Sequence, residues 1–113
     1  MRSKITTVEF PIFCDYIVHI EITSDMKKSL QKYKQTKSIE TDDATGGLAV
    51  HTDGSFSYIF LPYNTSVGDI AHEAWHVVKH MMDYVGVELD SETCAYHLGF
   101  LTNKIFRFVR GRK

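Results

Sequence analysis

The chain has 113 residues and a formal net charge of −1 at pH 7, which suits one domain over residues 1–113 and gives no general attraction to nucleic acid or to anionic membranes. Hydrophobic residues make up 43% of the chain and aromatic residues 12%, enough for a globular core and too much for a disordered chain. No apolar run reaches the length of a membrane span, and no signal-peptide segment follows the first residues. Cys14 and Cys94 are far apart, which predicts buried free thiols in a reducing compartment inside a cell, with a single bridge as the alternative.

The N-terminal part of the chain predicts two strands and a helix. Residues 5–22 are rich in β-branched and aromatic side chains, and Pro11 is expected to divide them or to mark a bulge. Apolar and polar side chains alternate in the second half of this segment, so His19 and Glu21 are expected to face solvent. A short helix over residues 26–34 follows, with a narrow apolar stripe and many lysines that we expect to form a solvated face.

The remainder of the chain predicts a hairpin and two long helices. Residues 47–52 and 55–61 resemble strands, and Asp53-Gly54 between them favours a tight β-turn. The second strand is nearly all apolar, so both of its faces are expected to be covered. Helices are predicted over residues 67–84 and 91–109, and their short connection should fold them antiparallel. The expected fold class is therefore α+β, with a small antiparallel or mixed sheet.

The first long helix contains His72-Glu73-Ala74-Trp75-His76, a His-Glu-x-x-His pattern. A spacing of four residues brings His72 and His76 to the same helix face, where two imidazoles can bind one zinc ion. Zinc lowers the pKa of a bound water to about 7, and the carboxylate of Glu73 can accept the proton. The apolar stripe of the helix lies opposite the two histidines and consists of Ile70, Ala74, Val77, Val78, Met81 and Val85. The pattern therefore predicts hydrolysis of peptide bonds by a zinc enzyme.

A third zinc ligand is needed, because catalytic zinc usually has three protein ligands and a water. His80 continues the spacing of the two histidines, but eight residues of helix rise about 12 Å, which is too far from His72 for one ion. Glu92, in the first turn of the next helix and away from its apolar stripe, is the favoured ligand. The competing interpretation of Glu92 is an acid that stabilises the helix N-terminus. The reserve ligands are Glu88, Asp90 and His97.

The His-Glu-x-x-His segment with a downstream helical Glu92 resembles the gluzincin branch of the zincin metallopeptidases, over roughly residues 47–100. The pattern Glu92-x-x-Ala95-Tyr96 is similar to small phage-type or bacterial proteins of this kind, which implies the cytoplasm of a bacterium or of a phage-infected cell. The resemblance implies that His72, His76 and Glu92 bind Zn²⁺ and that Glu73 is the general base. The family usually has a C-terminal subdomain that walls the substrate cleft, for which this chain is too short. The third His and the Gly that mark metzincins are absent.

Three functions remain open from the sequence. In a peptidase, Tyr96 could donate a hydrogen bond to the developing oxyanion, although an aromatic residue at the edge of the cleft would look the same. The alternative is a catalytically inactive domain of zincin fold that keeps zinc for folding and binds another protein; Glu73 favours the enzyme, because a structural zinc needs no general base. A repressor-cleaving peptidase linked to DNA is a third idea, motivated only by the lysine-rich helix. For the peptidase we expect a peptide or protein substrate, bound as an extended strand along residues 55–61 with Tyr58 and Tyr63 lining the cleft.

Overall fold

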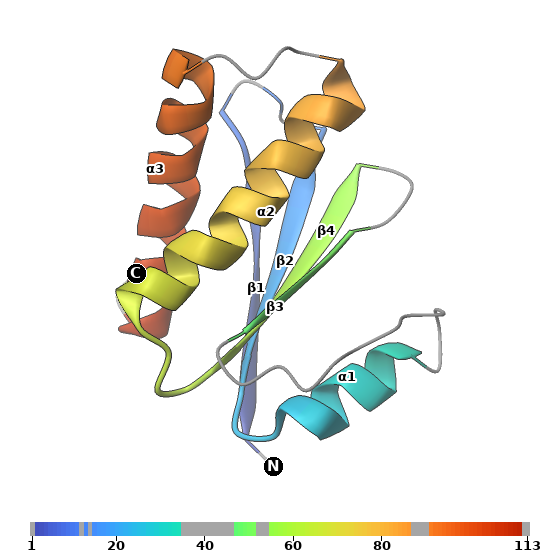
Figure 1. Cartoon of the computed structure of the whole chain (residues 1–113). Helices are drawn as coiled ribbons and strands as arrows, with labels where there is room; N and C mark the ends of the chain where they lie inside the picture. Colours follow the sequence, from blue (N-terminus) through green and yellow to red (C-terminus); the bar gives the residue numbers. More distant parts are fainter. Residues whose placement is uncertain are drawn as a thin grey trace.

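The computed structural model describes residues 2–11, 13, 15–34, 47–51, 55–86 and 91–111. Within these residues the chain is an α+β protein, in which four strands form one mixed sheet and three helices pack on it (Figure 1). The fold class expected from the sequence is confirmed at this level. The elements in chain order are β1 (Ser3–Glu9), β2 (Ile17–Thr23), α1 (Met26–Lys34), β3 (Leu48–His51), β4 (Phe56–Pro62), α2 (Val67–Val85) and α3 (Ser91–Val109).

The strand order is β1-β2-β4-β3, which places β3 at one edge of the described sheet. The neighbours β1 and β2 are antiparallel, as are β3 and β4, whereas β2 and β4 are parallel. The hairpin of β3 and β4 is confirmed, although Asp53-Gly54 lies outside the described residues. The expectation that an extended peptide binds along residues 55–61 needs a free strand edge there and is wrong, because β4 pairs on both sides. A nearly continuous apolar strand is typical of such an interior position.

The two faces of the sheet are covered by different helices. On one face α2 and α3 pack on the sheet and bury Val18, Ile20, Ile59 and Leu61. On the opposite face Leu30 of α1 packs against Val50 and Phe60. Both faces of β4 are therefore covered, as its apolar sequence predicts.

His19 and Glu21 lie on the face that α1 partly covers, so the expectation that they face solvent is wrong. Glu21 is 5% exposed and His19 is half-buried. Burial lowers the pKa of His19, and the charge of Glu21 opposes that shift only in part. Alternation along a strand identifies the polar face but does not reveal which element packs on it.

Local sequence signals define both ends of α2. The Ser66 hydroxyl accepts a hydrogen bond from the Asp69 N–H at 3.1 Å, which caps the first turn. Gly86 ends the helix with φ 75° and ψ 24°, a left-handed conformation that glycine adopts without a Cβ clash. After residues 87–90, which lie outside the described residues, α3 runs back antiparallel beside α2 (Figure 1).

Two expectations about the whole chain are partly covered by the described residues. In the described part of the chain, no helix is long and apolar enough to cross a membrane. Cys94 is buried and is a free thiol, as expected, whereas Cys14 lies outside the described residues.

Candidate metal centre

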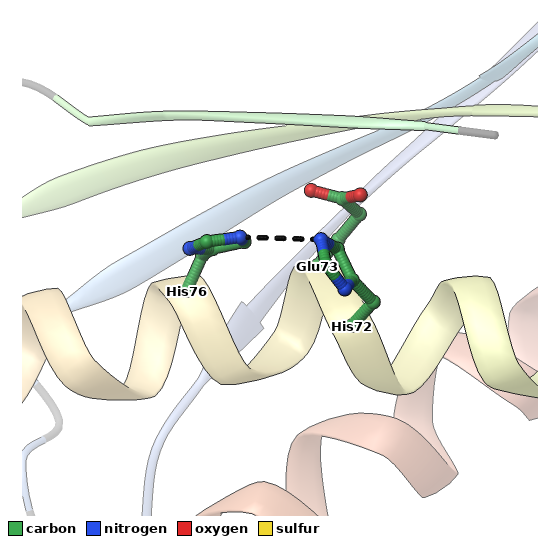
Figure 2. A group of neighbouring side chains, drawn as sticks. All are labelled: His72, Glu73 and His76. Carbon is green, nitrogen blue, oxygen red and sulfur yellow. Dashed lines mark hydrogen bonds between the residues drawn. The ribbon is translucent and has the colours of Figure 1, made fainter. Parts of the chain in front are cut away.

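His72 and His76 lie one turn apart on the exposed side of α2, opposite its buried stripe (Figure 2). Their Nε2 atoms are 3.3 Å apart, and their rings stand nearly edge to face at 74°. Two Zn–N bonds of about 2.05 Å at a tetrahedral angle would place their nitrogens about 3.3 Å apart. The observed spacing therefore fits two imidazoles that bind the same ion.

Glu73 points from α2 toward the sheet, beside the two imidazoles (Figure 2). It is 8% exposed, and its carboxylate accepts a hydrogen bond from the backbone N–H of Ala49 in β3. Ligand atoms of Glu73, His72 and His76 all lie within 4.8 Å of one another, and they are the one group of this kind in the described part of the chain. Burial raises the pKa of Glu73, although the two histidines and the Ala49 N–H act in the opposite direction. A carboxylate with a raised pKa is a stronger base.

Gly47 provides the space that Glu73 occupies, a role that the sequence did not predict. A Cβ on Gly47 would lie 2.8 Å from Leu61 Cδ2 and 3.2 Å from Glu73 Cγ, and its φ of 146° disfavours other residues. Any side chain at this position would press on the carboxyl arm of Glu73. The glycine pair at residues 46–47 was the available signal, but it marks a loop equally well.

The structure does not bring Glu92 or Tyr96 to the two histidines. Both are exposed on α3, on the side away from its buried face, and neither belongs to the His72–Glu73–His76 group. In Figure 2, α3 lies on the opposite side of α2 from the side chains drawn. The buried face of α3 consists of Cys94, His97, Leu101 and Ile105.

Of the three reserve ligands, only His97 lies within the described residues, and it is not part of the group. Glu88 and Asp90 lie outside the described residues. His97 is fully buried, and its Nδ1 lies 2.8 Å from the carbonyl oxygen of Thr93, one turn earlier in α3. Its ring stacks on Phe13 in the core.

His80 takes part in a hydrogen-bond network that the sequence did not predict. Its Nδ1 lies 2.6 Å from the hydroxyl of Tyr16, which also hydrogen-bonds the hydroxyl of Ser57 in β4. Tyr16 is almost fully buried, and this burial raises its pKa. The network joins α2 to the sheet about two turns beyond His72 and so helps to fix the helix in place. His80 is absent from the metal-binding group, in agreement with the distance argument from the sequence.

The two tyrosines expected to line the cleft lie elsewhere, so that expectation is wrong. Tyr58 lies on the opposite face of the sheet, where its ring contacts His19 and Phe60. Tyr63 lines a cavity between the start of α2 and the end of α3. Both assignments depended on β4 being the edge strand.

The chain was compared with protein-family models, with curated proteins and with solved structures, and none of them matches. The functional conclusion therefore rests on the chemistry of the residues around His72 and His76.

Proposed function

We propose that this protein is a zinc-dependent metallopeptidase of zincin type. The observation that carries the proposal is the pair of imidazole nitrogens 3.3 Å apart with the buried carboxylate of Glu73 beside them. Imidazole and carboxylate donors at this spacing suit zinc. A bound zinc ion would lower the pKa of a water to about 7 and polarise the carbonyl of the peptide bond.

Glu73 acts as the general base in this proposal. Its carboxylate takes a proton from the attacking water and delivers it to the nitrogen of the leaving amine. In the metal-free protein burial raises the pKa of Glu73, so its carboxylate is a stronger base there than an exposed one. Its neighbour Gly47 maintains the room in which the carboxylate moves between the two positions.

Glu92 remains the proposed third ligand, on the strength of the sequence. In the arrangement described above Glu92 lies away from the two histidines, so its binding to zinc requires the first turn of α3 to approach them. The competing ligand is Glu73 itself, whose oxygen lies within 4.8 Å of both imidazole nitrogens. A carboxylate that ligates zinc is no longer available as the base, so the two roles of Glu73 can be separated by mutation.

The proposed substrate is an extended peptide that adds a strand to β3. This strand pairs with β4 on one side, α2 runs beside it, and its other edge has no strand partner within the described sheet. The N–H of Ala49 already points away from β4, because it donates to Glu73. A peptide backbone that accepts from this N–H would free the Glu73 carboxylate to bind the water. Main-chain hydrogen bonds of this kind give affinity with broad side-chain preference.

The experiment is cleavage of an unstructured protein and of a quenched fluorescent peptide by the purified chain, with zinc added or chelated. Cleavage is expected only with zinc, and Glu73→Gln should lower it by about 100-fold or more. Lys79→Ala, an exposed position on the same helix, should cleave like the wild type. A protein that binds zinc but cleaves no peptide would instead be the inactive zinc-binding interaction domain.

A further inference from the structure

Positive and negative charges are separated along the molecule, although the formal net charge of the chain is only −1. In Figure 1, β1 and α1 begin and α3 ends in the lower half of the molecule, whereas β1 and α2 end and α3 begins in the upper half. Exposed acids stand at the upper ends of these elements, namely Glu9, Asp83 and Glu92. Exposed cations stand at the lower ends, namely Arg2, Lys27, Lys28, Arg107 and Arg110.

Contacts in the structure connect the cations of the lower half. The backbone N–H of Arg2 donates to the Ser24 hydroxyl at 2.8 Å, and the Ser24 N–H donates to the Arg2 carbonyl oxygen at 2.8 Å, so Arg2 lies beside the start of α1. The Nζ of Lys4 donates to the carbonyl oxygen of Phe108 at 2.9 Å, which joins the start of β1 to the end of α3. We call this set the cationic band: Arg2, Lys4, Lys27, Lys28, Arg107 and Arg110.

Two guanidinium groups of the band lie against aromatic rings. The guanidinium carbon of Arg2 is 4.1 Å from the centroid of the Tyr63 ring, and that of Arg110 is 5.0 Å from the centroid of the Phe106 ring. Such a contact restrains the planar group and leaves its N–H edge available to an anion. Within the described residues no carboxylate pairs with Arg2, Arg107 or Arg110. These guanidinium groups can therefore donate two hydrogen bonds at once to the oxygens of a phosphate.

The stability of the helices explains only part of the band. Cations at the end of α3 are favourable, because the C-terminus of a helix is partly negative. Lys27 and Lys28 lie at the opposite, partly positive end of α1, whose first turn contains no acid, and a cation there lowers helix stability. Asp25 and Asp69 lie at the starts of α1 and α2, but the cations of the band outnumber them. Charges that lower stability are typical of a functional surface.

The layout of the band determines the kind of partner. Its charges come from three elements and are spread along the surface, which suits a polymer whose own negative charges repeat along its length. Binding to a membrane surface would need apolar side chains that insert beside the charges. The exposed aromatic residues Trp75, Tyr84 and Tyr96 lie instead in the middle of α2, at its end and in the first half of α3.

We propose that the cationic band binds the phosphate backbone of nucleic acid, without preference for base sequence. Contacts to phosphates fix the position of a protein on a duplex and carry no sequence information. The separation of charges orients the molecule, with its acidic end away from the nucleic acid. Binding needs neither zinc nor peptidase activity, because no residue of the band belongs to the His72–Glu73–His76 group.

The test is the fluorescence anisotropy of a labelled DNA duplex of about 20 base pairs, titrated with the purified full chain. At about 50 mM salt the dissociation constant should be about 10 µM, which is typical of non-specific binding. About four phosphate contacts predict a slope of about −3.6 for the logarithm of the binding constant against that of the salt concentration. Affinity should then fall about 100-fold between about 50 and about 200 mM salt. No binding at the lower concentration, or binding that salt does not weaken, would overturn the proposal.

A matched pair of variants separates the band from net charge. Arg107→Gln should weaken DNA binding about fivefold and reduce the size of the salt slope by about 1. Lys79→Gln removes the same charge from an exposed position of α2 outside the band and should bind DNA like the wild type. Equal losses in the two variants would mean that only net charge matters, and the band would be wrong.

The lysines of α1 give a second, independent variant. The double change Lys27→Gln and Lys28→Gln should weaken DNA binding about 20-fold while the free energy of unfolding stays equal or rises, because both cations are unfavourable at a helix N-terminus. Unchanged DNA binding in this variant would overturn the band. Vesicles with phosphatidylserine and polyglutamate are the competitors, and tighter binding to either would assign the surface to a membrane or to an acidic protein instead. His72→Ala should bind DNA normally, so a failed metal centre would not be mistaken for a failed band.

Discussion

Glu73 combines burial, a hydrogen bond to β3 and proximity to two imidazoles in one side chain. Most carboxylates avoid such positions, since burial disfavours their charged form and raises their pKa. The space for this side chain exists because residue 47 is a glycine. A buried carboxylate that lowers the stability of the fold but acts as a strong base is typical of a functional site.

The substitution Glu73→Gln separates the two possible roles of this residue. As a base, Glu73 is not a ligand, so the variant should bind zinc with unchanged affinity while it loses cleavage by about 100-fold or more. If zinc affinity falls instead, Glu73 is the third ligand. Zinc binding is measured by competition with a chromophoric chelator, and cleavage with a fluorescent peptide.

The same substitution should stabilise the metal-free protein at pH 7. The raised pKa means that folding favours the protonated carboxyl, so its ionised form lowers stability once the pH exceeds the ordinary value of 4.5. Gln imitates the neutral form and should raise the melting temperature. The difference between the two proteins should shrink as the pH falls toward 4.5. A constant difference across this range would show that the carboxyl charge is not the cause.

Glu92→Gln tests the third ligand. Loss of a charged ligand should weaken zinc binding about 100-fold. Asp83→Asn is the control, because Asp83 is an exposed acid near the end of α2 that lies outside the metal-binding group. If both variants bind zinc like the wild type, Glu92 is only an N-terminal acid of α3 and the site holds zinc without it.

At the scale of elements, α2 and β3 together make the site. α2 carries His72, Glu73 and His76 of the proposed site, and Ala49 of β3, with Gly47 directly before that strand, contacts α2 at the point where Glu73 lies. Within the described sheet β3 has no strand partner on its outer side, so this position brings a strand edge close to the proposed metal. Peptide binding and catalysis would then share one pair of elements.

His51→Pro tests the use of the β3 edge. Backbone groups alternate along a strand, so the N–H of His51, like that of Ala49, should point away from β4. Proline removes this donor and should raise KM for peptides by about tenfold, with zinc still bound. His51→Ala is the matched control, because it loses the side chain and keeps the N–H. Equal KM values in the two variants would exclude substrate binding along this part of β3.

Local signals predicted the elements well and their pairing poorly. Ser66 and Gly86 lie directly beside the two ends of α2. The bounds of this helix, and the shared helix face of His72 and His76, could therefore be predicted. The parallel pairing of β2 with β4 joins strands separated by α1 and β3, and nothing in either strand identifies its partner. For the same reason the approach of Gly47 to Glu73 could not be predicted, and the placement of Glu92 relative to the histidines could not be derived from its helix alone.

At the scale of the whole molecule, the sheet is buried between α1 on one face and α2 with α3 on the other. The alternation in β2 predicted correctly which residues share a face, yet it could not predict that α1 would pack there and bury Glu21. Polar groups that seem suited to solvent therefore lie partly inside the protein. The lowered pKa of His19 links the stability of the fold to pH.

His19 should make the protein less stable in acid. Its pKa is lowered in the folded chain, so its contribution to stability is present above the ordinary value of 6.5 and is lost as the pH falls through the folded value. The replacement His19→Gln cannot take up this proton. Denaturant unfolding of metal-free protein between pH 7 and 5 should therefore show a steeper loss for the wild type, and parallel curves would contradict the assignment.

Zinc stoichiometry tests the central claim most directly. Purified wild-type protein should bind about one zinc ion per chain in a calorimetric titration, and zinc should raise its melting temperature. His72→Ala should lose this binding, whereas Lys79→Ala on the same helix should keep it. A wild-type protein that takes up no zinc and gains no thermal stability from it, or one that binds zinc equally after His72→Ala, would contradict the metal centre and the peptidase built on it.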